Sequence, residues 1–454
     1  MKLPIEAVLG LVMAVCLVDT TEAVPSFAQQ TGQPCSACHV GAFGPQLKPY
    51  GRDFKLYGYT SSDGRKHLPT IAFSLQTGYT HTDADQEGLV AQGLKANDNL
   101  LIDEQLSVYY AGRLAKEVGA FIQVTYNGGP KVLQWDNTDV RYAHPTEVFG
   151  KDTVFGLTLN NSPTVQDLWN ATPSWGFPYN SSSIAPSPAA SALSDGTLAQ
   201  QVLGAGGYIM WNDLLYVEGT VYRFLSRDTL DRLGVGPSAG QSSDTFAGAI
   251  PYGRIAIEHG TGHHYFQTGA FTLVADRNPA GDRSIGTTDH IVDRALDANY
   301  QFVGSKSHFV SAHAIFIHED ESLRADQILA GTRPNDTLRT FRVDVSYSFR
   351  DTWTPSIQFF QNTGSRDAAL WGTSNGSPDT RGHVAEIAFV PWGKLKSLPQ
   401  WMNVRFAAQY VSYDKFDGSS RGSSLNNTLF LSCWIAVAPL YGVEKNFLPK
   451  QGTR

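Results

Sequence analysis

The stretch Phe341-Arg-Val-Asp-Val-Ser-Tyr-Ser-Phe349 alternates between apolar and polar residues at every position. In an extended strand its odd-numbered residues share one face, and the other face carries Arg342, Asp344, Ser346 and Ser348. A strand of about ten residues with one apolar and one polar face is typical of a transmembrane β-barrel, whose outer surface meets lipid and whose interior is polar. This pattern therefore predicts one strand of such a barrel.

The same period recurs along most of the chain and divides it into regular segments. We predict 16 strands, an even number of the kind that single-chain bacterial barrels use. They start near residues 69, 100, 118, 131, 153, 203, 214, 246, 262, 289, 307, 336, 352, 381, 402 and 426. The predicted fold is thus all-β: a 16-stranded outer-membrane barrel over residues 69–442, preceded by a short helical segment and followed by a tail at 443–454.

The connections between these strands alternate in length. Those after odd-numbered strands are long and rich in Gly, Ser, Asp, Asn or Pro, as at 83–98, 164–202, 226–245, 320–335, 364–380 and 415–425. Asn127 to Pro130 is the exception, because it is short where a long loop is expected. Because such barrels have short periplasmic turns and long outer loops, both ends of the barrel are expected to face the periplasm. A soluble β-sandwich would also alternate, but it gives no reason for long and short loops to take turns.

The composition agrees with this class of protein. Charged residues make up 17% of the chain and aromatic residues 11%, and the net charge of -7 argues against a nucleic-acid partner. Residues 1–23 read as an export signal, with Lys2, an apolar core from Ala7 to Val18, and cleavage expected after Ala23. After this signal the sequence has no apolar run of roughly 18 residues, so no transmembrane helix is expected.

A second motif precedes the strands. Cys35-Ser-Ala-Cys-His39 is a C-x-x-C-H sequence, which is the covalent attachment site of a c-type haem. The thiols of Cys35 and Cys38 would form thioethers to one porphyrin, and His39 would be an axial ligand of its iron. A thioredoxin-like motif or a structural zinc site are the alternatives, but neither accounts for His39.

Residues 24–68 are therefore expected to form a monohaem cytochrome c segment. A segment this short buries little apolar surface by itself, so the barrel wall should complete its core. Pro45 to Tyr57 reads as a helix interrupted by Pro49 and Gly51, in which Leu47, Tyr50, Phe54 and Tyr57 are able to cover the ring. Lys48, Arg52 and Lys55 are candidates for the haem propionates, with two of the three expected to be solvated.

The sixth ligand of the iron is not identified by the sequence. His67 is the nearest candidate distal ligand, and His81, His313 and His318 are candidates from the barrel wall. In the longest connection, the first half, including Asp167, Trp169 and Phe177, is expected to fold inward as a constriction, while Asn180 to Gly196 reads as disordered. Carboxylates expected to face the lumen, and so to attract Fe(II), are Asp103, Asp139, Glu258 and Asp344.

The order of these features resembles a known family. An export signal, the stretch Pro25 to Gly32, the C-x-x-C-H motif and Tyr50-Gly-Arg-Asp-Phe-Lys55 precede a barrel, and Asn161 to Asn170 also resembles that family. It is the family of fused outer-membrane cytochrome-porins of iron-oxidising bacteria. The resemblance implies one covalent haem c on a 16-stranded porin in the outer membrane, with the haem segment at the periplasmic side or inside the lumen.

The resemblance further implies that electrons are taken from extracellular Fe(II). Their expected acceptor is a periplasmic carrier, either a cytochrome or a copper protein. Two alternatives stay open: the same conduit exporting electrons to extracellular acceptors, and a solute porin with a haem-bearing plug. Whether the chain acts as an enzyme or only as an electron carrier stays open as well.

Overall fold

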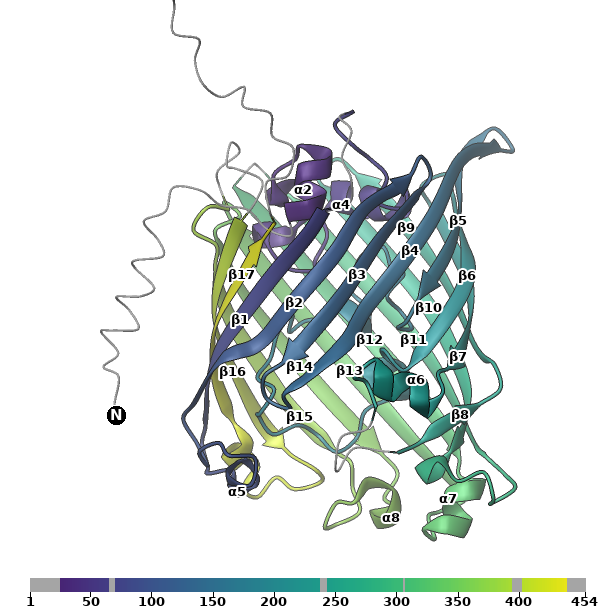
Figure 1. The fold of residues 1–454 in the computed structure, drawn as a ribbon, viewed down its shortest axis with the longest axis vertical. Helices are drawn as coiled ribbons and strands as arrows, with labels where there is room; N and C mark the ends of the chain where they lie inside the picture. The colour runs from purple at the N-terminus through teal and green to yellow at the C-terminus, as the bar shows by residue number, and fades with distance from the viewer. Residues whose placement is uncertain (1–24, 65–69, 237–242, 305–306, 394–401, 439–454) are drawn as a thin grey trace, which may run out of the picture.

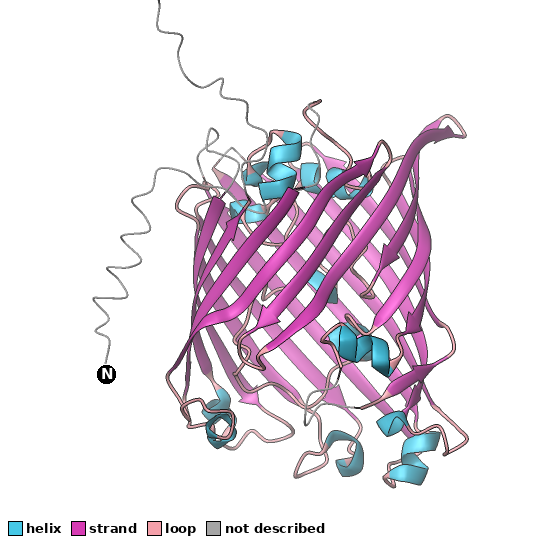
Figure 2. Ribbon diagram, viewed as in Figure 1, coloured by secondary structure: helices cyan, strands magenta, loops and turns pink. Residues whose placement is uncertain are grey.

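The computed structural model describes residues 25–64, 70–236, 243–304, 307–393 and 402–438, which form a closed antiparallel β-barrel around an inner filling of helices and loops (Figures 1 and 2). Each strand pairs with its neighbours in sequence, and the first pairs with the last, from Phe73–Val437 to Thr82–Thr428. The strands are β1 (Thr70–Thr82), β2 (Asn99–Ala115), β3 (Val118–Asn127), β4 (Val132–Val148), β5 (Lys151–Asn160), β6 (Val202–Trp211), β7 (Leu215–Phe224), β8 (Thr245–Ala247), β9 (Ile250–Thr261), β10 (His264–Asn278), β11 (Asp289–Val303), β12 (His308–Ser322), β13 (Asn335–Phe349), β14 (Trp353–Gly364), β15 (Thr380–Phe389), β16 (Met402–Lys415) and β17 (Thr428–Val437).

The barrel has 16 membrane strands, because β8 and β9 are two parts of one strand. Both pair with β10, and the break between them lies at Gly248, whose φ is +67°. A positive φ interrupts the ladder at little cost where the residue is glycine. The prediction of 16 strands is confirmed, and every strand begins within two residues of its predicted start.

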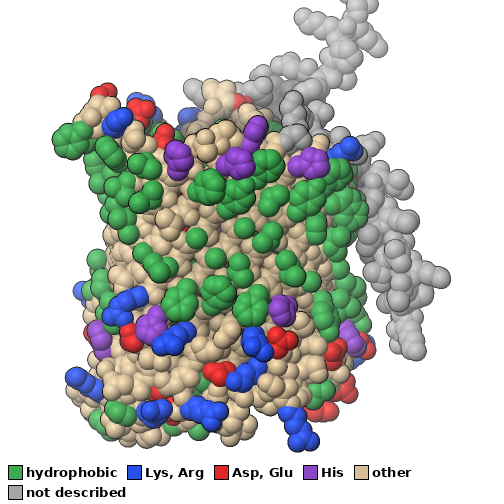
Figure 3. Space-filling model, turned by 180° about the vertical axis from the view of Figure 1, so that it is seen from behind, with side chains coloured by type: hydrophobic (Ala, Val, Ile, Leu, Met, Phe, Trp, Pro, Cys, Tyr) green, Lys and Arg blue, Asp and Glu red, His purple; other side chains and the backbone are tan. Residues whose placement is uncertain are grey.

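The outer wall of the barrel is apolar and the inner wall is polar. Figure 3 shows a broad hydrophobic band on the outer surface, to which Leu296, Phe316 and Phe341 contribute with exposed fractions of 62%, 39% and 38%. On β13 the alternate residues Asp344, Ser346 and Ser348 are buried in the lumen. In a closed barrel the backbone N–H and C=O groups of the strands find hydrogen-bond partners on neighbouring strands, as the hydrocarbon core requires, and the apolar band faces the lipid. The protein is an integral outer-membrane protein.

The long connections and the N-terminal segment lie at opposite ends of the barrel (Figure 1). The long-loop end carries α5 (Glu87–Val90), α7 (Arg324–Leu329), α8 (Ala368–Trp371) and the short turns η4 (Pro279–Gly281) and η5 (Ser423–Asn426), and α6 (Arg227–Arg232) lies nearer the middle. The short-turn end carries the N-terminal helices, which places it on the periplasmic side. No helix in the described parts of the chain is long and apolar enough to cross a bilayer.

A bulge in β2 changes which carboxylate enters the lumen. The pairing of β1 with β2 shifts between Gln76–Gln105 and Gly78–Leu101, so β2 has extra residues at this point. As a result Glu104 is buried, with an exposed fraction of 1%, and Asp103 is exposed. The prediction that Asp103 faces the lumen is wrong, because a bulge breaks the strict two-residue alternation.

The N-terminal segment consists of α2 (Pro25–Thr31), α3 (Cys35–Cys38), the turn η1 (Val40–Ala42) and α4 (Pro49–Leu56), as a helical segment in the mouth of the barrel. Pro49 does not interrupt a helix but occupies the first turn of α4, where its missing N–H is not needed. Gly51 lies inside α4, so the predicted interruption at this residue is also wrong. The predicted signal, His67 and the tail 443–454 lie outside the described residues.

The longest connection folds into the lumen, as predicted for its first half. It contains the turn η2 (Pro173–Trp175) and the π-helical turn η3 (Leu193–Thr197). The prediction that Asn180 to Gly196 is disordered is wrong, because this half is packed against the inner wall. Asn180 contacts Ser432, and Ala190, Ala192 and Leu193 join an apolar cluster with residues of β9 to β13. We call residues 161–201 the inward loop.

The apolar band predicts how substitutions on the outer wall affect stability. We expect Leu296→Arg to destabilise the barrel by about 2 kcal/mol or more, because a cation on the lipid face near the membrane centre is costly. Urea unfolding of the protein in lipid vesicles measures the effect. Phe149→Arg is the matched control, since Phe149 lies in a periplasmic turn and is 93% exposed. Equal stability of the two variants would contradict a lipid-facing position for Leu296.

Candidate haem-attachment site in the periplasmic mouth

The C-x-x-C-H motif forms a single helical turn in the mouth of the barrel. Cys35 and Cys38 are the first and last residues of α3, so their side chains lie one turn apart on the same side. The backbone N–H of His39 donates to Cys35 O at 2.8 Å and closes the turn. A short β-bridge between His39 and Leu47 ties this turn to the chain that leads into α4.

Helix α4 packs directly on the motif, and Gly51 makes this packing feasible. A Cβ atom at residue 51 would lie 2.6 Å from Cys38 O and 3.0 Å from a methyl group of Leu47. The backbone N–H of Lys48 donates to Cys38 O at 2.7 Å. Gly51 is therefore required by a close approach to the motif and not by a bend in the helix.

The barrel wall completes the core around the motif, as the short length of the segment predicts. Cys35 packs with Ala42 and Phe43 of its own segment and with Val390, Trp434 and Ala436 of the wall. The side chain of Asn403 on β16 donates to Ala42 O at 2.9 Å. These contacts fix the motif against the ends of β16 and β17.

His39 presents an imidazole suited to ligation. Its Nδ1 is buried and has no hydrogen-bond partner among the described residues. Burial lowers the pKa of His39 to about 4, and the charge of Lys48 adds to the lowering. The ring is therefore neutral at pH 7, and a neutral imidazole is the form that binds a metal.

These residues fit a c-type haem. Two half-buried thiols stand one helical turn apart, and the adjacent neutral imidazole has a buried nitrogen without a partner. Burial raises the pKa of Cys38 to about 12, which is opposite to the lowered pKa of a redox-active thioredoxin-like cysteine. Within the described residues no group of three or more His, Cys, Asp or Glu side chains is arranged to hold a metal ion.

The three cations, Lys48 at the N-cap of α4 and Arg52 and Lys55 within it, bind other parts of the protein, and none of them is exposed. Lys48 forms an ion pair with Asp351 at 2.6 Å, and Arg52 donates to Gln301 and lies 3.8 Å from the ring of Trp169. Lys55 donates to three acceptors of the inward loop: Val165 O at 2.6 Å, Asp167 O at 2.8 Å and Asn170 Oδ1 at 2.6 Å. The sequence suggested propionate partners, but the tertiary structure uses these side chains to anchor the segment.

Of the side chains that the sequence proposed as a cover for the ring, two are already packed. Phe54 lies 5.0 Å from Phe27 and 5.8 Å from Tyr59 between ring centroids. Leu47 is buried, while Tyr50 is 40% exposed at the surface of the mouth.

The three candidate histidines of the wall point in different directions. His313 points into the lumen, where its Nε2 lies 3.2 Å from Gln46 Nε2 and its Nδ1 lies 3.0 Å from Asp344. Gln46 belongs to the N-terminal segment and its backbone lies beside His39. His81 and His318 face the outer surface, where they contact Asp98 and Asp320, so the expectation that they reach inward is wrong.

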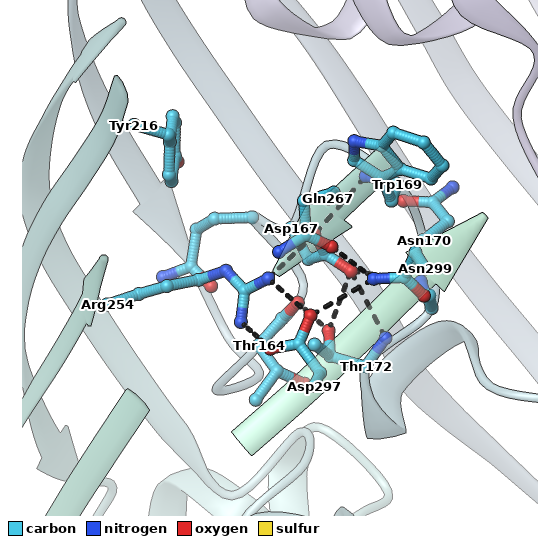
Figure 4. A network of polar contacts seen from close by, with 12 residues as sticks. Thr164, Asp167, Trp169, Asn170, Thr172, Tyr216, Arg254, Gln267, Asp297 and Asn299 are labelled. Carbon is cyan, nitrogen blue, oxygen red and sulfur yellow. Dashed lines mark hydrogen bonds and ion pairs between the residues drawn. The ribbon is translucent and has the colours of Figure 1, made fainter. Parts of the chain in front are cut away.

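The inward loop is held across the lumen by a buried polar network centred on Asp167 (Figure 4). Its carboxylate accepts from the backbone N–H groups of Trp169, Ala171 and Thr172 at 3.2, 2.9 and 3.1 Å. Arg254 of β9 lies 3.4 Å from Asp167 and 2.7 Å from Asp297 of β11. Since Lys55 binds the carbonyl of Asp167, the network joins the loop to both the wall and the N-terminal segment.

The loop also reaches the other sides of the barrel. Gln358 of β14 donates to Phe177 O at 2.6 Å, and Gln409 of β16 donates to Asn180 O at 3.0 Å. Asp195 forms an ion pair with Arg342 of β13. The inward loop therefore spans the lumen from β9 to β16.

Three of the four carboxylates predicted to face the lumen do so, but each is near a cationic or donor side chain. Asp139 contacts Arg141 and Tyr59, Asp344 contacts His313, and Glu258 lies near Arg52.

A larger acidic group, which the sequence analysis did not identify, lines the lumen toward the extracellular end. It consists of Asp289, Asp293, Glu319, Glu321 and Asp336, all at most 6% exposed. The even spacing of these residues along their strands was the available signal.

Comparisons with known proteins bear on the barrel. No family model and no curated protein matches the chain. The outer membrane channel DcaP of Acinetobacter baumannii is 12% identical, with 85% of this chain and 100% of that chain covered and a TM-score of 0.47. An anion-selective porin of Comamonas acidovorans is 10% identical, with 82% and 99% covered and a TM-score of 0.44. OprB of Pseudomonas putida is 10% identical, with 82% and 93% covered and a TM-score of 0.44.

The anchoring of α4 generates a test. We expect Lys55→Met to loosen the N-terminal segment by about 3 kcal/mol, because three buried acceptors lose their donor. Limited proteolysis should then cleave the N-terminal segment faster than in the unchanged protein. Lys116→Met, at an exposed periplasmic turn, is the matched control and should leave the cleavage rate unchanged. Equal cleavage rates in both variants would contradict an anchoring role for Lys55.

Proposed function

We propose that the protein is an outer-membrane electron conduit that oxidises extracellular Fe(II) and passes the electrons to a periplasmic carrier, a cytochrome or a copper protein. The observation that carries the proposal is the position of the C-x-x-C-H turn in the periplasmic mouth of a membrane barrel whose lumen is crossed by the inward loop. A metal oxidised at the outer end would stay outside, and only the electron would need to cross.

The residues of the mouth have separate roles in this proposal. Cys35 and Cys38 would hold one haem c covalently, and His39 would ligate its iron. When bound, the haem would supply a one-electron couple whose oxidised form can accept one electron from each Fe(II). Lys48, Arg52 and Lys55 hold the segment at a fixed depth, so the distance from the site to the lumen is set by the protein.

The electrostatics of the lumen support a cationic substrate at the extracellular end. Among the described residues five carboxylates are buried together at this end, and Arg277 pairs with one of them, Asp289, at 3.1 Å. Fixed carboxylates in a narrow polar lumen raise the local concentration of cations. This negative region faces the side on which Fe(II) would arrive.

Two alternatives use the same fold. A conduit that exports electrons would have the same structure, because the direction of flow follows from the potentials of the partners. A solute porin with a haem-bearing plug fits the barrel as well. The inward loop and the haem segment together fill both the middle and the mouth of the lumen, which favours the conduit over the porin.

The proposal is tested by mixing the purified haem protein with Fe(II) in a stopped-flow spectrometer. We expect the bands of reduced haem to appear, and His39→Ala to lose the native haem spectrum and the reaction. His144→Ala, a change at an exposed histidine of the outer wall, is the control and should behave as the unchanged protein. Intact haem that Fe(II) does not reduce would overturn the proposed direction, and an unchanged spectrum of the His39 variant would overturn the ligation.

Conductance in planar bilayers separates the conduit from the porin. We expect the unchanged protein to pass little ionic current, because the inward loop spans the lumen. Arg254→Gln removes the guanidinium that joins Asp167 to Asp297 and should produce frequent openings. Large, steady current through the unchanged protein would favour the solute porin instead.

A further inference from the structure

A row of basic side chains crosses the outer wall of the barrel on three adjacent strands. Arg294 of β11 lies directly opposite His318 of β12, which lies directly opposite Arg339 of β13. Their neighbours in sequence, such as Asp293 and Glu319, are buried in the lumen, so these three face outward. The side chain of Arg294 is 60% exposed.

The row lies at the extracellular edge of the apolar band. One row toward the periplasm, the outward residues are Leu296, Phe316 and Phe341, which are aligned across the same three strands and exposed to lipid. Two residues along a strand span roughly 7 Å, so the basic row lies that much farther from the membrane centre than the apolar row. This distance takes it from the hydrocarbon to the level of the lipid headgroups. Figure 3 shows charged and histidine side chains gathered below the hydrophobic band, at the end opposite the N-terminal segment.

The row carries net positive charge. Asp320 is the carboxylate in contact with it, since both Arg294 and His318 bind Asp320. Arg339 Nε donates to His318 Nδ1 at 3.4 Å. Two guanidinium groups against one carboxylate leave one cation uncompensated.

We propose that Arg294, His318 and Arg339 bind a phosphate group of a phosphorylated glycolipid in the outer leaflet. Guanidinium groups bind phosphate through paired N–H donors, and strands about 5 Å apart present the donors side by side. The apolar row beneath them continues the same surface, so acyl chains of the same molecule would lie on Leu296, Phe316 and Phe341. This continuity of a phosphate-binding row with an apolar surface identifies a lipid and not free phosphate.

The proposal is independent of the haem, and binding to the purified full chain in detergent micelles tests it. Diphosphoryl lipid A should raise the unfolding temperature of the unchanged protein, whereas dephosphorylated lipid A and inorganic phosphate should not. The double variant R294Q/R339Q should bind diphosphoryl lipid A roughly thirtyfold more weakly. The haem spectrum should be unaffected in this variant.

Arg223→Gln is the matched control, because Arg223 is an exposed, outward arginine on β7 at a distance from the row in the strand order. It should bind lipid A as the unchanged protein does. Equal binding of phosphorylated and dephosphorylated lipid A would overturn the proposal, as would equal stabilisation by inorganic phosphate or unchanged affinity in R294Q/R339Q. If that variant does not fold, the comparison of the three ligands on the unchanged protein decides the question by itself.

Discussion

The structure depends on one constraint: inside a bilayer every backbone N–H and C=O group needs a partner within the protein. The pairing of β1 with β17 closes the sheet and removes the last two edges at which such groups would face hydrocarbon. Closure in turn fixes an inside and an outside for every strand. The polar inner wall and the lipid-facing apolar band both follow from it.

A closed barrel of 16 strands encloses a lumen that the chain itself fills. The inward loop enters from the extracellular end and the N-terminal segment covers the periplasmic end. Both bring polar groups into the barrel interior, away from bulk water. Buried charges are stable there only when paired. The Asp167, Arg254 and Asp297 network and the three acceptors around Lys55 meet this requirement, and they connect the two fillings to each other.

This arrangement separates the two sides of the protein chemically. The periplasmic mouth holds two thiols and a neutral imidazole against an apolar wall, whereas the extracellular part of the lumen carries a cluster of buried carboxylates. On the outside of the same strands, basic side chains follow the edge of the apolar band. Under the proposed function, Fe(II), the electron carrier and the membrane would each meet a different one of these surfaces.

The number of strands, their positions and their orientation were determined by the sequence alone, because the two-residue period and the loop lengths are local. The C-x-x-C-H motif is equally local. The tertiary structure decided the partners of Lys48, Arg52 and Lys55 and the inward position of Glu104. It also decided that His313 points into the lumen while His81 and His318 face outward. Asn180 to Gly196 shows the reason: its composition has few apolar residues and reads as disordered, but strands distant in sequence supply the hydrogen-bond partners that order it.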